Sequence, residues 1–159
     1  MRKSIFGKKI KNSYMRKMKV IITTDSEILN ERLQKILGGI QNLDAAGKGK
    51  DMDEALALVK SIQPDAMIIS FNRITTQVFE KMKEIKKAKP DLIVIVLSSY
   101  PFVQYKIQWK EAGANFVFDQ AMQFGKMVDV LCDLLYKQKL ETLIVKKSLG
   151  ESNSHYLNT

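Results

Sequence analysis

Short apolar runs alternate with longer segments of helical periodicity from residue 19 to about residue 139. Continuous apolar runs are typical of strands buried on both faces, and strands separated by helices are typical of a parallel sheet. The runs that predict strands are Val20 to Thr23, Leu43 to Ala46, Ala66 to Ile69, Leu92 to Leu97 and Phe116 to Phe118. They predict an α/β fold, a doubly wound five-stranded parallel sheet covered by helices on both faces.

Five helices are predicted between and after these strands from their capping residues and their apolar spacing. Their expected starts are Ser26 as an N-cap, the capping box from Asp51 to Glu54, Thr75 or Thr76, Pro101 and Phe124. The first is expected to stop at Gly38-Gly39, the second at Pro64 and the fourth at Gly113. The fifth has the strongest periodicity, through Phe124, Met127, Val128, Leu131, Leu134 and Leu135.

A chain of 159 residues can bury one sizeable core without a disulfide or a metal. Cys132 is the only cysteine and lies in an apolar helical pattern, so we expect a core thiol in a reducing cytoplasm. The only histidine, His155, stands in a polar terminal stretch and is expected to be exposed. The sequence predicts no metal, no cofactor and no histidine-dependent catalysis.

The net charge of +9 is concentrated at the start of the chain, where residues 1–19 hold eight Lys or Arg and no acid. We expect a disordered basic tail over residues 1–17. Three interpretations stay open: translation that starts at Met15 or Met18, a solvated tail, and a tail that contacts nucleic acid or an anionic membrane. The tail lacks the apolar run of a secretory signal, and no apolar stretch is long enough to cross a bilayer.

The domain is predicted to cover residues 18–139, followed by an extension over 140–159 that is helical and then disordered. Leu140, Leu143 and Ile144 continue the apolar pattern after a shift in phase. They predict either a dimer or partner seam, or a frayed end that covers its own domain. About 20 residues after the fifth helix are too few for an appended DNA-binding module.

The residues directly after the predicted strands carry the candidate site, because ligands of such sheets bind at the carboxyl ends of the strands. These residues are Thr24, Asp25, Ser70, Ser98 and Asp119. The stretches VIITTDSEIL, PDAMIISFN, DLIVIVLSSY and EAGANFVFDQ resemble the receiver domains of two-component response regulators from residue 18 to about 137. The resemblance implies a flavodoxin-like fold with strand order 2-1-3-4-5 and a role in phosphorelay signal transduction.

The resemblance also implies a phosphorylation pocket, from which this sequence departs. Receivers place an acidic pair after strand one, an aspartate phosphoacceptor after strand three, a Ser or Thr after strand four and a lysine after strand five. Asp25 and Ser98 match this pattern, and Phe116 matches the aromatic that reports activation. Thr24, Ser70 and Asp119 replace the first acid, the phosphoacceptor and the lysine, and Gln120 replaces the following proline.

Phosphoryl transfer to a receiver needs a carboxylate nucleophile, oxygen ligands for Mg²⁺ and a cation to balance the developing charge. A serine hydroxyl without a neighbouring base is a poor nucleophile, and Asp119 reverses the sign of the charge. The sequence therefore predicts a degenerate pocket that is not phosphorylated. Two other uses are weighed: Asp25 and Asp119 around a cation, and Ser70 modified by a serine kinase.

Helix four carries two apolar arcs, of which only one can face the sheet. Phe102, Tyr105 and Trp109 form one arc, and Val103 and Ile107 form the other. Core packing of the aromatic arc is the first interpretation. The second is that Phe102, Tyr105 and Trp109 belong to a partner surface made by helix four, strand five and helix five.

These patterns favour a stand-alone pseudo-receiver that binds a signalling protein or a second copy of itself and is not an enzyme. One alternative is an atypical but working phosphorelay response regulator. Another alternative is a small flavodoxin-like enzyme or cofactor carrier. The sequence lacks a Gly-rich phosphate loop, which argues against this alternative.

Overall fold

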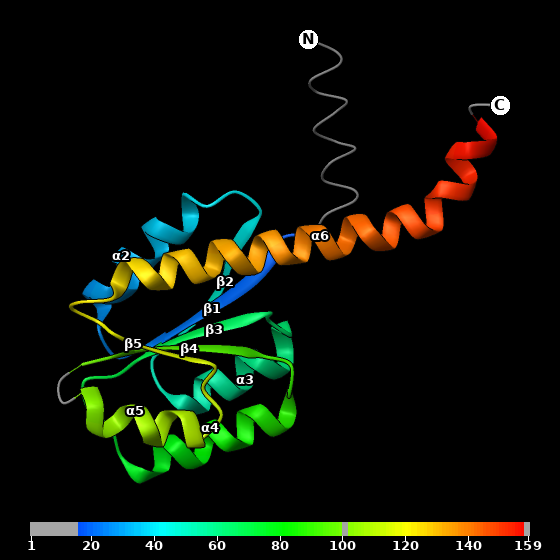
Figure 1. Cartoon of the computed structure of the whole chain (residues 1–159). Helices are drawn as coiled ribbons and strands as arrows, with labels where there is room; N and C mark the ends of the chain where they lie inside the picture. The colour runs from blue at the N-terminus through cyan, green and yellow to red at the C-terminus, as the bar shows by residue number, and fades with distance from the viewer. Residues whose placement is uncertain (1–15, 100–101, 158–159) are drawn as a thin grey trace.

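The computed structural model describes residues 16–99 and 102–157, with the backbone alone for residue 102 and residues 150–157. Five strands and five helices alternate along the described chain (Figure 1). The strands are β1 (Met18–Thr24), β2 (Leu43–Gly49), β3 (Ala66–Ser70), β4 (Ile93–Ser98) and β5 (Phe116–Asp119). The helices are α2 (Glu27–Gly38), α3 (Met52–Ile62), α4 (Thr76–Ala88), α5 (Phe102–Glu111) and α6 (Phe124–Leu157).

The five strands form one parallel sheet in the order β2-β1-β3-β4-β5. The predicted fold class and strand order are therefore confirmed. Parallel strands are usually buried on both faces, and β3 is buried along its whole length. Its neighbours β1 and β4 are almost as well covered, which explains why their apolar runs are continuous.

Two helical layers enclose the sheet, with α2 and α6 on one face and α3, α4 and α5 on the other (Figure 1). Alternate residues of each strand point to opposite layers, so that Ile21 packs under α3 while Ile22 packs under α2. Leu33 and Leu37 of α2 meet Met127 and Leu131 of α6 in the second core cluster. This packing holds the carboxyl ends of all five strands at one edge.

Two of the predicted helix caps are formed as the sequence indicates. The Ser26 hydroxyl accepts a hydrogen bond from the Leu29 amide at 3.2 Å, and the Asp51 carboxylate accepts one from the Glu54 amide at 2.8 Å. Thr75 is the N-cap of α4 but makes no side-chain cap bond. Pro101 lies outside the described residues.

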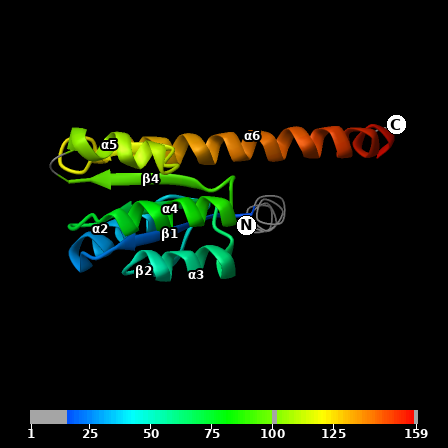
Figure 2. The same cartoon turned by 90° about the horizontal axis from the view of Figure 1, so that it is seen from below.

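Helix α6 is much longer than the sheet that it covers. It runs over 34 residues, and its C-terminal part projects beyond the other elements (Figure 2). The helix runs through the predicted extension as far as Leu157. None of the helices in the described part of the chain combines the length and the apolar composition that crossing a bilayer requires.

The predicted core position of Cys132 is wrong, because its thiol is exposed. The α6 residues that face the sheet include Met127 and Leu131. Cys132 follows Leu131 by one residue, about 100° around the helix, and so turns toward solvent. The side chain of His155 and residues 1–15 of the basic tail lie outside what the structure describes.

Arg16 and Asp65 tie the start of the described chain to the amino-terminal end of β3. The guanidinium donates to both carboxylate oxygens, at 3.0 Å and 2.6 Å, and the Lys19 amide donates to the same carboxylate at 2.8 Å. The hydrogen bond to Asp65 raises the pKa of the Arg16 guanidinium, against the opposing effect of burial. Such two-point pairing fixes geometry as well as charge.

Candidate functional site at the strand ends

The structure brings the predicted site residues to one edge of the sheet. Thr24 of β1 lies opposite Ser70 of β3, and Ser98 of β4 lies opposite Asp119 of β5. The side chains of Thr24, Ser70 and Ser98 are buried, Asp119 is half-buried and Asp25 is exposed. The pocket floor is thus made of hydroxyl groups, with one carboxylate on each side.

Gln120 closes this floor, which the sequence reasoning did not anticipate. The Ser70 hydroxyl donates to the Gln120 side-chain oxygen at 2.9 Å. The backbone N–H of Gln120 donates to the Ser98 carbonyl at 2.9 Å. The Ser70–Gln120 bond therefore passes from the end of β3 to the residue after β5, across the end of β4. A long amide side chain directly after the last strand was the available signal.

The two carboxylates hold different loops. Asp25 accepts from the Asn72 amide at 3.1 Å and 3.3 Å, which fixes the loop between β3 and α4. Asp119 accepts from the amides of Ala121 and Met122 at 2.9 Å and 3.1 Å, an arrangement that stabilises its own turn. Each acid thus has a local structural role.

The remaining hydroxyl groups are also bonded locally. The Thr24 oxygen accepts from the Ser26 amide at 3.1 Å, and the Ser98 hydroxyl donates to the Ser99 carbonyl at 3.2 Å. In the Ser70–Gln120 bond, the acceptor is an amide oxygen, which is too weak a base to take the proton of a nucleophilic serine. Among the described residues, no three Asp, Glu, His or Cys side chains gather in a way that could hold a metal ion.

A hollow of about 310 Å³ opens beside Asp25, between α3 and the loop before α4. Lys50, Arg73 and Lys81 line it together with Asp51 and Asp53. Hydrogen bonds to Asp53 at 2.9 Å and to Glu84 at 3.3 Å raise the pKa of the Lys81 ammonium. Part of the positive charge in this hollow is therefore balanced within the protein.

Phe116, at the position of the activation-reporting aromatic, lies on β5 with its side chain half-buried. Its ring stacks on Phe118, with centroids 6.0 Å apart, and the Lys110 ammonium lies 5.9 Å from its centroid. Lys110 also donates to the Asn115 carbonyl at 2.6 Å. The ring is thus part of the junction between α5 and β5.

Tyr105 and Trp109 of the aromatic arc of α5 pack inward, which corrects their alternative assignment to a partner surface. Trp109 is 1% exposed and meets Phe79 edge to face, with centroids 4.9 Å apart. Tyr105 is partly buried against the same core cluster, and the Phe102 side chain lies outside the described residues. The arc that the helix displays consists of Val103 and Ile107, which are 75% and 62% exposed.

Comparisons with known proteins return response regulators, although no family model matches the chain. The transcriptional regulatory protein DegU of Brevibacillus brevis is 22% identical over 115 residues, which are 72% of this chain and 49% of that protein. The transcriptional activator DevR/DosR of Mycobacterium tuberculosis is 26% identical over 98 residues, 62% of this chain and 45% of its own length. The chain spans about half the length of these curated relatives.

Solved structures give the same result for the fold. A LuxR-family two-component response regulator from Aurantimonas sp. SI85-9A1 has a TM-score of 0.67 at 14% identity and covers 76% of this chain and 86% of its own. A CheY-like receiver domain protein from Methanospirillum hungatei JF-1 has a TM-score of 0.65 at 14% identity, with coverages of 80% and 98%. The chain therefore has the fold of the response regulator receiver domains.

Proposed function

We propose that this chain is a pseudo-receiver, a signalling module that regulates partners by protein–protein contact and without phosphorylation. The observation that carries the proposal is the hydrogen bond between Ser70 and Gln120. It occupies the position where the resemblance expects a free carboxylate nucleophile. The proposed module is cytoplasmic and is not an enzyme.

The bonding of the two acids supports the same function. A receiver that binds Mg²⁺ needs carboxylate oxygens directed at a shared cation. Here Asp25 accepts from the loop before α4, and Asp119 accepts from the turn after β5. Both acids are thus engaged by backbone amides of neighbouring loops, which supports a function that needs neither Mg²⁺ nor a phosphoryl group.

The partner surface that we propose is the face made by α5, β5 and α6, for a signalling protein or a second copy of the chain. Its apolar contact residues are Val103 and Ile107, not the buried Trp109. Exposed aliphatic side chains on neighbouring turns of one helix form a small apolar contact patch.

The direct test is treatment of the purified chain with acetyl phosphate and Mg²⁺, followed by intact-mass analysis. Neither the wild-type chain nor Ser70→Ala should gain mass, because neither offers an activated nucleophile. A mass increase of one phosphoryl group that maps to Asp25 or Ser70 would instead support the atypical phosphorelay receiver.

Restoring the phosphoacceptor alone should not restore switching. Ser70→Asp adds a carboxylate between Asp25 and Asp119 and provides no lysine, so like charges oppose its ionisation. We expect no beryllofluoride binding and a loss of stability from the broken bond to Gln120, measured by fluorescence titration and urea unfolding. Tight beryllofluoride binding by this single variant would contradict the charge argument.

A further inference from the structure

Two separate segments carry the whole net charge of the chain. Residues 1–17 hold seven Lys or Arg and no acid, and residues 136–149 hold four Lys and one Glu. The other residues together hold 15 basic and 16 acidic side chains, so they are almost neutral. A positive charge gathered in this way attracts an anionic partner at a distance.

The structure places the end of the first segment, Arg16, beside the second segment. Gln138, at the point where α6 leaves the sheet, donates a side-chain hydrogen bond to the Arg16 carbonyl at 3.4 Å. Arg16 is itself fixed by its two bonds to Asp65. The basic segment therefore joins the domain beside the start of the α6 extension.

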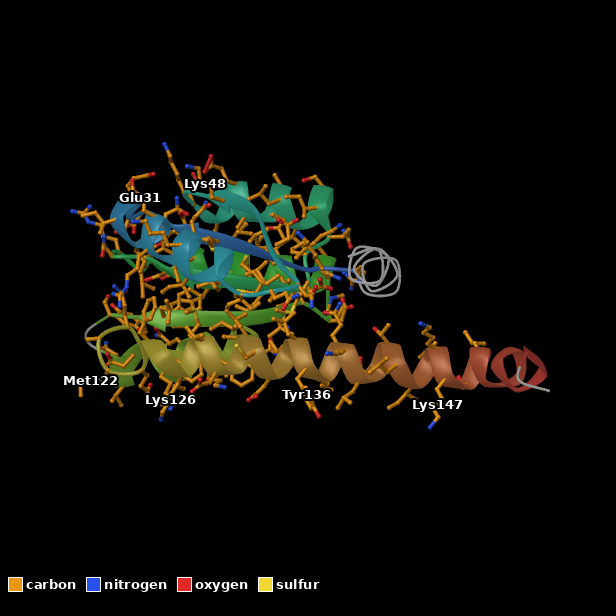
Figure 3. The ribbon with its side chains drawn as sticks, turned by 90° about the horizontal axis from the view of Figure 1, so that it is seen from above. Glu31, Lys48, Met122, Lys126, Tyr136 and Lys147 are labelled. Carbon is orange, nitrogen blue, oxygen red and sulfur yellow. The ribbon has the colours of Figure 1, made fainter. Side chains whose placement is uncertain are left out.

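The extension also displays an apolar stripe, which we call the outer stripe. Its four residues are between 41% and 65% exposed and recur at i, i+4, i+7 and i+8, which places them on one face of the helix. They are Tyr136, Leu140, Leu143 and Ile144. Figure 3 shows that Tyr136 and Lys147 point to the same side of α6, away from the rest of the domain.

Lysines border the outer stripe. Lys137 and Lys139 flank Tyr136 and Leu140, and Lys147 follows Leu143 by one turn; all three are exposed. Glu141, three residues before Ile144, also lies beside the stripe, so the border is mostly but not wholly basic. Exposed aliphatic residues between lysines are typical of helices that lie in the interface of an anionic membrane.

Asp129 and Asp133 mark the limit of this surface. They precede Tyr136 by seven and three residues and so lie on the same side of α6. They belong to the part of the helix that covers the sheet. Their charge opposes contact of the domain with an anionic surface. The basic and apolar part therefore begins where the helix leaves the sheet.

We infer that the α6 extension, together with the neighbouring Arg16 and Lys17, forms a peripheral docking site for an anionic lipid surface. Lipid headgroups balance the lysines while the acyl boundary takes the outer stripe, and two such signals together give stable attachment. A second copy would bring two strongly positive regions together. Nucleic acid would balance the charge but would leave the aliphatic stripe without a contact.

The experiment is co-sedimentation of the full chain with vesicles that contain about 30% phosphatidylglycerol in phosphatidylcholine, against phosphatidylcholine alone. We expect binding to the anionic vesicles only, and a steep loss between about 50 mM and about 500 mM salt. This outcome is independent of the pocket, so phosphorylation of the chain would leave it unchanged.

Matched variants separate the outer stripe from the rest of the helix. Leu140→Gln, Leu143→Gln and Ile144→Gln together should weaken vesicle binding by about tenfold or more, since they remove the inserted surface. The control replaces Val145 and Leu149 by Gln. These residues are exposed and lie on the side of α6 that carries Met127 and Leu131, so this variant should bind as wild type. Lys137→Gln, Lys139→Gln and Lys147→Gln together should weaken binding by roughly 100-fold.

Three results would overturn the inference. One is equal binding to neutral and anionic vesicles. The second is tighter binding of the full chain to duplex DNA than to the vesicles, with no effect of the outer-stripe variant. The third is a dimer, seen by light scattering, that the outer-stripe variant dissociates while vesicle binding is unchanged.

Discussion

Both parts of α6 carry an apolar stripe, but the two stripes have different surroundings. From Phe124 to Leu135 the apolar residues cover the sheet, with Met127 and Leu131 fully buried. Beyond Thr142 the helix projects past the sheet, and Leu143 and Ile144 stay exposed. The difference shows that a helical apolar stripe predicts a contact but not whether the contact lies within the chain.

Helix α5 also has a buried and an exposed apolar arc, here on opposite sides of the same turns. Tyr105 and Trp109 face the core, while Val103 and Ile107 face outward. Since both arcs are apolar, the position of α4 decides which one is buried: Phe79 of α4 receives the Trp109 ring. The core contacts and the proposed partner surface therefore lie on opposite sides of one helix.

The largest effect is expected from Trp109→Ala. Removing a fully buried indole leaves a cavity between α4 and α5 and should cost about 4 kcal/mol in the free energy of unfolding. The matched variant Ile107→Ala should cost less than about 0.5 kcal/mol, because its side chain is exposed. Urea unfolding of both variants measures the difference. Similar costs for the two would show that the two arcs of α5 are not divided in this way.

A somewhat smaller effect is expected along α6. Leu131→Ala should lower the free energy of unfolding by about 3 kcal/mol, since Leu131 is fully buried between the sheet and α2. Leu143→Ala, in the same helix, should change it by less than about 0.5 kcal/mol. A large cost at Leu143 in a monomer would mean that the extension folds back on its own domain.

The smallest effect is expected at Cys132. Cys132→Ser should leave the free energy of unfolding within about 0.5 kcal/mol of wild type, because the thiol is exposed beside the buried Leu131. Reaction of the folded chain with a thiol reagent should be fast and complete. Slow labelling that becomes fast only in denaturant would mean that the Cys132 thiol is buried, as the apolar pattern predicts.

The fold was predictable from the sequence because continuous apolar runs have few structural solutions. Each predicted strand lies within one or two residues of an observed one, apart from β2, which extends to Gly49. Ser26 and Asp51 were predictable as caps because a helix start leaves amides that only a nearby acceptor can satisfy. The prediction for Cys132 was wrong because one residue in an apolar pattern can lie just beside the buried stripe.

The positions of the site were predictable, but its hydrogen bonds were not. A strand end fixes where Ser70 and Asp119 stand, since parallel strands finish at one edge. The choice of partner depends on the loop after β5, whose path follows from the bonds of Asp119 and Gln123. Only with that path in place does the Gln120 side chain reach Ser70.

The Ser70–Gln120 bond has an evolutionary consequence. An apolar residue at position 120 would leave the buried Ser70 hydroxyl without its partner, which costs about 1 to 3 kcal/mol. Residues 70 and 120 are therefore expected to change together among relatives that share this pocket.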